Sequence, residues 1–171
     1  TYQISIDTVV NNYQFNTYVT AVSDNAEFTS WTENSKVVSY AKEYSFFVGC
    51  DRTLTSVNSG AVAAQAVLAV NNVWTDGTYD YVLTEWALPE GCTLVAEGVI
   101  MTKDASVDLT AKTLADVDAT TIRVASTRLT SSAGQYLLYT NTNANFEAKA
   151  YLTYSDGTNQ YTIYTDAVTV A

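Results

Sequence analysis

The stretch Ala148-Lys-Ala-Tyr-Leu-Thr-Tyr-Ser-Asp-Gly-Thr-Asn-Gln-Tyr-Thr-Ile-Tyr164 decides the fold class of this chain. Side-chain character alternates along it with a period of two, and Asp156-Gly157 interrupts the alternation. A period of two indicates β-strands, and Asp-Gly between two such runs is a strong β-hairpin signal. We therefore predict strands at Ala148–Tyr154 and Tyr161–Val170. On the first strand, one face carries Ala148, Ala150, Leu152 and Tyr154, and the other carries Lys149, Tyr151 and Thr153.

A second Asp-Gly pair, Asp76-Gly77, predicts a hairpin between strands Val67–Trp74 and Tyr79–Trp86. The segment Ala61–Val70 fits either a short helix or a strand, because it is rich in Ala but also tolerates alternation. Asn58–Gly60 breaks the pattern and is a predicted boundary. Other strands are predicted at Tyr44–Val48, Leu54–Val57, Leu94–Met101, Val107–Leu114, Ile122–Leu129 and Gln135–Thr140. The prediction is an all-β chain of two small modules.

Composition excludes several classes of function. The 171 residues carry a net charge of −10 and no histidine. This charge argues against nucleic acid as a partner and disfavours anionic membrane surfaces, because there is no basic stripe to replace condensed counterions. Catalytic triads and metal sites that need histidine are excluded as well, and we expect no cofactor and no bound metal. No apolar run is long enough to cross a membrane, so we expect no membrane insertion.

The two cysteines, Cys50 and Cys92, lack the spacing of a metal or redox motif. Both lie beside turn residues, which favours a disulfide in an oxidising compartment, either within one chain or between chains. Two buried free thiols are the alternative. The chain begins at Thr1 without a leader, which predicts a processed mature chain or an excised fragment.

The first third of the chain contains four motifs in a fixed order: Phe28-Thr-Ser-Trp31, Lys36-Val-Val-Ser-Tyr40, Tyr44-Ser-Phe-Phe-Val48 and Asp51-Arg-Thr-Leu-Thr-Ser-Val57. This order resembles the internalin-type B-repeat, a small β-grasp-like module of Gram-positive surface proteins. The resemblance covers residues 1–58 and implies that Trp31 is buried. The chain departs from the pattern at Cys50, where a small or polar residue is usual, and at Ser56, which replaces Ala.

Residues 61–171 resemble the immunoglobulin-like or fibronectin-III-like domain that follows such repeats in clostridial surface proteins. The resemblance is carried by Leu88-Pro-Glu-Gly91, Gly98-Val-Ile-Met-Thr-Lys103, Gly134-Gln-Tyr136 and the hairpin from Ala148 to Val168. Cys92 stands where that pattern has an aromatic residue. Together the two resemblances imply a β-grasp-like module followed by an immunoglobulin-like β-sandwich. They also imply a secreted, surface-displayed, non-catalytic protein, with no ligand and no catalytic residue to carry over.

Three kinds of chemistry have candidate residues in this sequence, and a plain structural role is favoured over each of them. A glycosidase-like acid pair needs two carboxyl groups facing each other across a cleft, and the candidates are Glu85, Glu90 and Glu97. Calcium needs converging carboxylates, and the candidate pairs are Asp76–Asp80, Asp104–Asp108 and Asp116–Asp118. A lysine–asparagine isopeptide bond is a possibility that the family resemblance implies, and its candidates are Lys103, Lys112 and Lys149.

Aromatic residues offer an alternative function. Trp31, Trp74, Trp86 and the Tyr-rich last hairpin could present apolar faces to sugar rings, as in an adhesin or a carbohydrate-binding module. The structural reading is that Trp31 belongs to the core, and that Trp74 and Trp86 face each other across a hairpin. A host molecule or a glycan is therefore a possible ligand.

The N-terminal strand predicts self-association. Tyr2, Ile4 and Ile6 alternate with polar residues, and the strand lacks Pro, Gly and Lys. An edge of this kind is open to β-strand addition from another chain unless it pairs within its own sheet. Our first hypothesis is a non-catalytic extracellular structural protein, either a repeating subunit of a filament or a stalk module. It would assemble by β-strand addition, with Tyr2, Ile4 and Ile6 as the donor strand.

Overall fold

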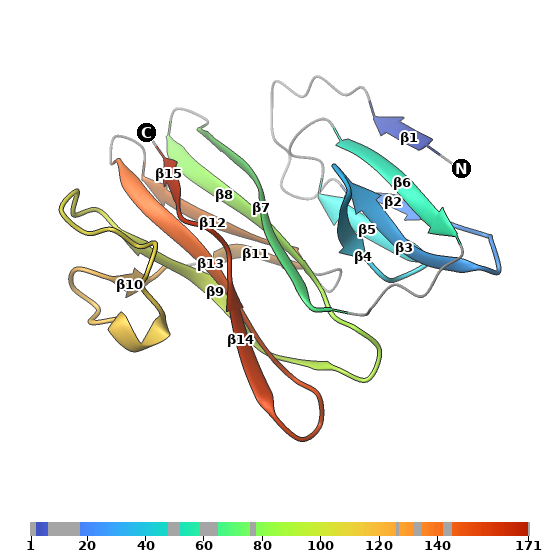
Figure 1. Ribbon diagram of the computed structural model, residues 1–171. Coiled ribbons are helices and arrows are strands. Elements are labelled where there is room, and N and C mark those ends of the chain that lie inside the picture. The colour runs from blue at the N-terminus through green and yellow to red at the C-terminus, as the bar shows by residue number, and fades with distance from the viewer. Residues whose placement is uncertain are drawn as a thin grey trace.

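The computed structural model describes residues 3–6, 18–47, 52–58, 65–75, 78–125, 127–131, 135–141 and 145–170. The predicted all-β class is confirmed, because these residues form antiparallel strands in several sheets (Figure 1). Among them, the only helical element is the single 3₁₀ turn η1 (Leu114–Asp116). No helix in the described residues is long and apolar enough to cross a membrane.

The N-terminal module consists of two sheets packed around one core. Its larger sheet has the order β1-β6-β3-β4, formed by β1 (Gln3–Ile6), β6 (Arg52–Asn58), β3 (Phe28–Glu33) and β4 (Lys36–Ser39). The smaller sheet pairs β2 (Tyr18–Val22) with β5 (Glu43–Phe47). Side chains from both sheets meet in a core of Ala21, Trp31, Val38, Tyr44, Phe46 and Leu54. Trp31 is fully buried, as expected.

The C-terminal sandwich consists of two further sheets. One has the order β11-β12-β8-β7, formed by β11 (Thr127–Ser131), β12 (Gln135–Asn141), β8 (Tyr79–Ala87) and β7 (Val67–Thr75). The other has β10 (Arg123–Val124), β9 (Thr93–Thr102), β13 (Phe146–Ser155) and β14 (Gln160–Tyr164), with β15 (Val168–Val170) also paired to β13. The two sheets enclose a core that includes Val82, Val99, Ala148 and Ala150.

The division into modules follows the cores. Among the described residues, one core cluster consists of residues before Asn58, and two others consist of residues after it. The β-grasp-like arrangement and the boundary at Asn58–Gly60 stay predictions, since residues 59–64 lie outside the described residues. Where the segment Ala61–Val70 is described as regular structure, it is strand β7 rather than helix.

The deciding hairpin forms as predicted, with one modification. β13 pairs with β14 from Tyr151↔Tyr164 to Ser155↔Gln160, and the intervening turn is closed by the Asp156 carboxylate, which accepts from Thr158 N and Asn159 N. The predicted second arm is divided in two. Residues 165–167 leave the ladder, and β15 resumes the pairing at Ala148↔Val168.

The strand predicted at Val107–Leu114 is wrong, whereas the one predicted at Ile122–Leu129 is divided into β10 and β11, which belong to different sheets. Residues 103–122 form a loop of turns that lies against the outer face of β9 and β13. Its apolar residues Val107, Leu109, Leu114, Val117 and Ile122 cluster with Ile100 and Tyr151. The alternating apolar residues of this loop therefore cover a sheet and do not form a strand of one. Periodicity alone does not distinguish these two cases.

Candidate functional site

A buried ion pair joins the two modules. Arg52, on β6, donates through Nη2 to Glu85 Oε2 on β8 at 2.8 Å, and its Nη1 donates to Glu85 Oε1. The same guanidinium lies 2.7 Å from Glu33 Oε2 on β3. The Arg52 and Glu85 side chains are only 1% and 2% exposed, so this is a fully desolvated, bidentate pair between modules.

Two aromatic residues, Tyr44 and Phe46, complete this buried contact between the modules, which we call the joint. The Tyr44 hydroxyl, on β5, donates to Glu85 Oε1, and the Arg52 guanidinium lies 4.8 Å above the centre of the Phe46 ring. Burial and the neighbouring Glu85 carboxylate raise the pKa of Tyr44 well above its usual value, so the phenol stays protonated and keeps donating. The carboxylates of Glu85 and Glu33 keep Arg52 charged despite its burial. The joint therefore consists of one positive and two negative side chains with a neutral phenol that donates to Glu85.

The strand that carries Glu85 is buried on both faces. Val82 belongs to the sandwich core, while Tyr81, Leu83 and Ala87 lie on the alternate face with Glu85 and are also buried. Strand β4 of the N-terminal module contacts β8 from that side. The ion pair of the joint therefore lies on a buried face of β8.

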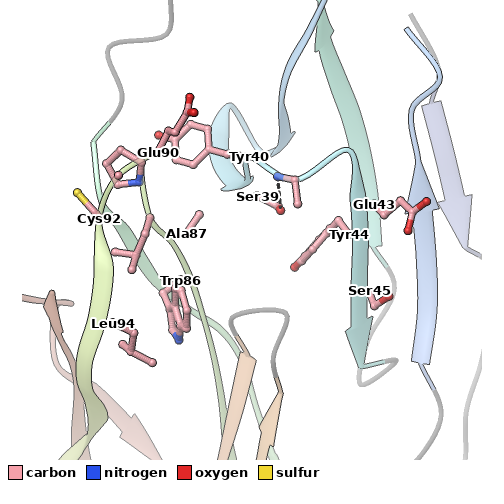
Figure 2. A pocket seen from close by; sticks show the side chains of 14 residues that line it. Ser39, Tyr40, Glu43, Tyr44, Ser45, Trp86, Ala87, Glu90, Cys92 and Leu94 are labelled. Atoms are coloured by element: carbon pink, nitrogen blue, oxygen red, sulfur yellow. Dashed lines mark hydrogen bonds between the residues drawn. The ribbon is translucent and has the colours of Figure 1, made fainter. Parts of the chain in front are cut away.

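A cleft of about 600 Å³ opens beside the joint. One wall comes from the β4–β5 turn and β5, and the other from the end of β8 and the turn into β9 (Figure 2). The residues that line it include Tyr40, Glu43, Tyr44, Trp86, Glu90 and Cys92. Residues of both modules line this cleft, and it is the candidate site.

Two aromatic rings in the cleft are held by their polar ends. The Tyr40 hydroxyl donates to the carbonyl of Gln65 at 2.8 Å, which ties the β4–β5 turn to the chain just before β7. The indole Nε1 of Trp86 donates to Glu97 Oε2 on β9. Partial burial raises the pKa of Glu97, and the Trp86 hydrogen bond opposes that rise. Both rings are therefore fixed in orientation.

The three candidate acids are not brought together as a catalytic pair. Glu85 is bound to Arg52 and Tyr44, and Glu97 accepts from Trp86. Glu90 is exposed at the rim of the cleft. Trp74 and Trp86 are not cross-strand partners, contrary to the expectation: the register places Trp74 opposite Tyr81 and Trp86 opposite Leu68.

The candidate calcium pairs serve turns. The carboxylates of Asp104, Asp108 and Asp116 accept from backbone N–H groups of Ser106, Thr110 and Thr113. Asp118 accepts from three, those of Thr120, Thr121 and Ile122. Asp80 is buried, and Asp76 lies outside the described residues. No group of three or more potential metal ligands occurs in the described ranges.

These turns predict an acid-sensitive stability. The backbone hydrogen bonds lower the pKa of Asp118 to about 2, below its usual 3.8. A carboxyl with a lowered folded-state pKa adds stability above the unfolded pKa and loses it as the pH falls toward the folded one. We therefore expect Asp118→Asn, which keeps an accepting oxygen, to flatten the stability profile between about pH 4 and 2. Urea midpoints measured across that range test this, and an unchanged slope contradicts it.

Lys149 has a structural role. Its ammonium group is buried and donates to the carbonyls of Thr110 at 2.7 Å, Lys112 at 3.1 Å and Leu109 at 3.3 Å. It also lies 5.2 Å from the centre of the Tyr164 ring. The amine holds the 103–122 loop against the sheet. Of the other isopeptide candidates, Lys112 forms an ion pair with Asp116 and Lys103 is exposed.

Only some of the residues in the cysteine and donor-strand predictions lie in the described part of the chain. Cys92 is half-buried and lines the cleft, whereas Cys50 lies outside the described residues, so the disulfide stays a prediction. Tyr2 also lies outside them. Ile4 and Ile6 belong to β1, which pairs antiparallel with β6 through Ile4↔Leu54 and Ile6↔Arg52. In this structure the N-terminal strand pairs within its own sheet and forms the edge of it.

The joint was missed at the level of sequence, although one signal was present. Arg52 and Glu85 are opposite charges placed within strand-like alternation, each at an inward position of its strand. Charged residues are rarely buried unless they are paired. In a chain with only 15% charged residues, two such positions are informative.

The comparisons with known proteins supply no relative: the chain matched no family model, no curated protein and no solved structure.

Proposed function

We propose that this chain is a non-catalytic extracellular structural protein, a rigid two-module unit that acts as a filament subunit or a stalk module and assembles by β-strand addition. The observation that carries the proposal is the Arg52–Glu85 pair, which fixes one β-module to the next in a fully buried contact. Two β-modules held in a fixed relative orientation keep the ends of the unit at a constant separation, which a spacer or a filament subunit requires. The internalin-repeat resemblance of residues 1–58 supports a surface location.

The edge strand β1 supplies the assembly surface. β1 and β4 are the two edges of the sheet β1-β6-β3-β4, and β4 contacts the C-terminal sandwich. β1 lies on the side of the module away from β8 (Figure 1). An edge strand presents N–H and C=O groups that a strand of a neighbouring copy can pair with. Head-to-tail contacts of this kind produce filaments when they do not close.

Assembly is expected to be concentration-dependent and to need salt. The net charge of −10 makes copies repel one another at low ionic strength, and about 0.15 M salt screens that repulsion beyond roughly 8 Å. We expect filaments or open-ended oligomers in negative-stain images and in light scattering at this ionic strength. A monomer at every concentration, or a closed dimer, contradicts the filament proposal.

The variant Ser5→Lys tests whether β1 is the surface used. A lysine on the edge strand hinders edge-to-edge pairing without removing the strand from its own sheet. We expect it to raise the critical concentration for assembly by at least about tenfold. The control Ala26→Lys adds the same charge at an exposed turn away from the edge and is expected to assemble normally. Equal assembly by both variants excludes β1.

A further inference from the structure

We propose that the cleft between the modules binds an uncharged saccharide, with the rings of Tyr40 and Trp86 as its contact surfaces. This inference goes beyond the structural role proposed above, and neither depends on the other. It rests on the walls of the cleft, on the way these two rings are fixed, and on the charges around them.

The rings are ready-made binding surfaces. Tyr40 and Trp86 come from different modules, and both are half-buried, so each keeps an exposed part that lines the cleft (Figure 2). The hydroxyl of Tyr40 is bound to Gln65 and the indole N–H of Trp86 to Glu97. With the polar ends occupied, the rings offer apolar faces in a fixed orientation. A pyranose ring has a flat C–H face that matches such a surface, and fixed orientation lowers the entropic cost of binding.

The polar groups of the cleft are acceptors. The carboxylate of Glu90 is exposed at its rim and Ser39 adds a hydroxyl oxygen, whereas the side chains of Glu43 and Ser45 leave β5 on the side opposite Tyr44, away from the cleft (Figure 2). Carboxylates accept hydrogen bonds from sugar hydroxyl groups. Among its described lining residues there is no Lys or Arg. Phosphate, sulfate and uronic acid groups would therefore be repelled, and an uncharged sugar is favoured over an anionic one.

The size of the cleft favours a sugar over a cation. Acidic and aromatic side chains also attract ammonium groups, but a cation site needs its rings to close around a single small group. The volume of about 600 Å³ lies in the range of sites for drug-sized molecules. A short stretch of a saccharide chain fills such a space, whereas a lone ammonium group does not.

The test is a titration with soluble, uncharged hexasaccharides followed by tryptophan fluorescence, since Trp86 is one of three tryptophans. The panel contains the α- and β-linked glucose, the mannose, the xylose and the N-acetylglucosamine oligomers, each taken to about 10 mM to detect weak binding. We expect at least one to change the fluorescence with a saturable curve. Trp86→Ala and Tyr40→Ala are each expected to weaken that binding by about tenfold.

The control variant is Tyr161→Ala. Tyr161 is exposed, stacks on Tyr154 in the last hairpin and lies outside the cleft. We expect it to bind like the native chain, with binding followed by calorimetry in every variant. Tyr40→Ala decides the matter if Trp86→Ala does not fold, because Tyr40 lies in a turn at the surface. The inference is overturned by no binding to any uncharged sugar, by loss of binding in Tyr161→Ala alone, or by binding of trilysine with no sugar bound.

Discussion

Replacing Arg52 by Met is expected to lower the free energy of unfolding by about 3–5 kcal/mol. The substitution removes the positive charge and leaves the Glu85 carboxylate buried beside the Tyr44 hydroxyl. An uncompensated buried charge costs far more than the pair itself contributes. Urea denaturation followed by far-UV circular dichroism measures the change.

The double variant Arg52→Met/Glu85→Met separates pairing from packing. Two apolar side chains of similar length remove the charges together, so we expect most of the lost stability to return. Lys112→Met is the matched control, because Lys112 and Asp116 form an ion pair at 3.3 Å with side chains 40% and 35% exposed. An exposed pair contributes little to stability, because solvent and salt screen it. Similar losses in Arg52→Met and Lys112→Met would mean that the joint is not the buried network described above.

Replacing Trp31 by Ala is expected to cost about 3–5 kcal/mol. Trp31 is fully buried between the two N-terminal sheets, and its ring lies 5.4 Å from that of Phe28. Removing it leaves a cavity that the surrounding strands cannot close. The N-terminal module should then unfold at lower urea than the sandwich, giving two transitions by fluorescence and circular dichroism.

Trp31→Phe is the informative companion to that variant. The indole Nε1 of Trp31 is buried and has no hydrogen-bond partner among the described residues. Phenylalanine keeps much of the ring volume and removes this unsatisfied donor, so the two effects partly offset each other. We expect a loss of about 1–2 kcal/mol. A loss as large as that of Trp31→Ala would show that the indole N–H is satisfied in solution.

Side-chain periodicity predicted the strands but not the roles of every apolar segment. The hairpin at Asp156 and the strands β9, β12 and β13 follow from alternation and turn residues, which act locally. The loop 103–122 has a similar apolar pattern, but its apolar residues cover the outer face of β9 and β13 instead of forming a paired strand. Whether such a segment pairs or covers depends on distant strands, which a local pattern does not contain.

The candidate site was predictable only in its residue types. The sequence singled out Trp86, Glu85, Glu90 and Glu97, but as an acid pair and a tryptophan pair. Trp86 binds Glu97 instead, and the partners of Glu85 come from the other module: Arg52 is 33 residues from Glu85, and Tyr44 is 41 residues from it. Contacts at such separation are set by how the modules pack, and no spacing rule within one strand predicts them.

The central claim is that the two modules form one rigid unit, and spin-label distance measurements test it most directly. One label replaces Val22 in the N-terminal module and the other replaces Val124 in the sandwich, both exposed, in a Cys50→Ser/Cys92→Ser background. A second pair at Val124 and Tyr161, within the sandwich, gives the width of a rigid reference. The account predicts a single inter-module distance with a distribution as narrow as the reference. A broad or multiple distribution in the native joint would contradict it.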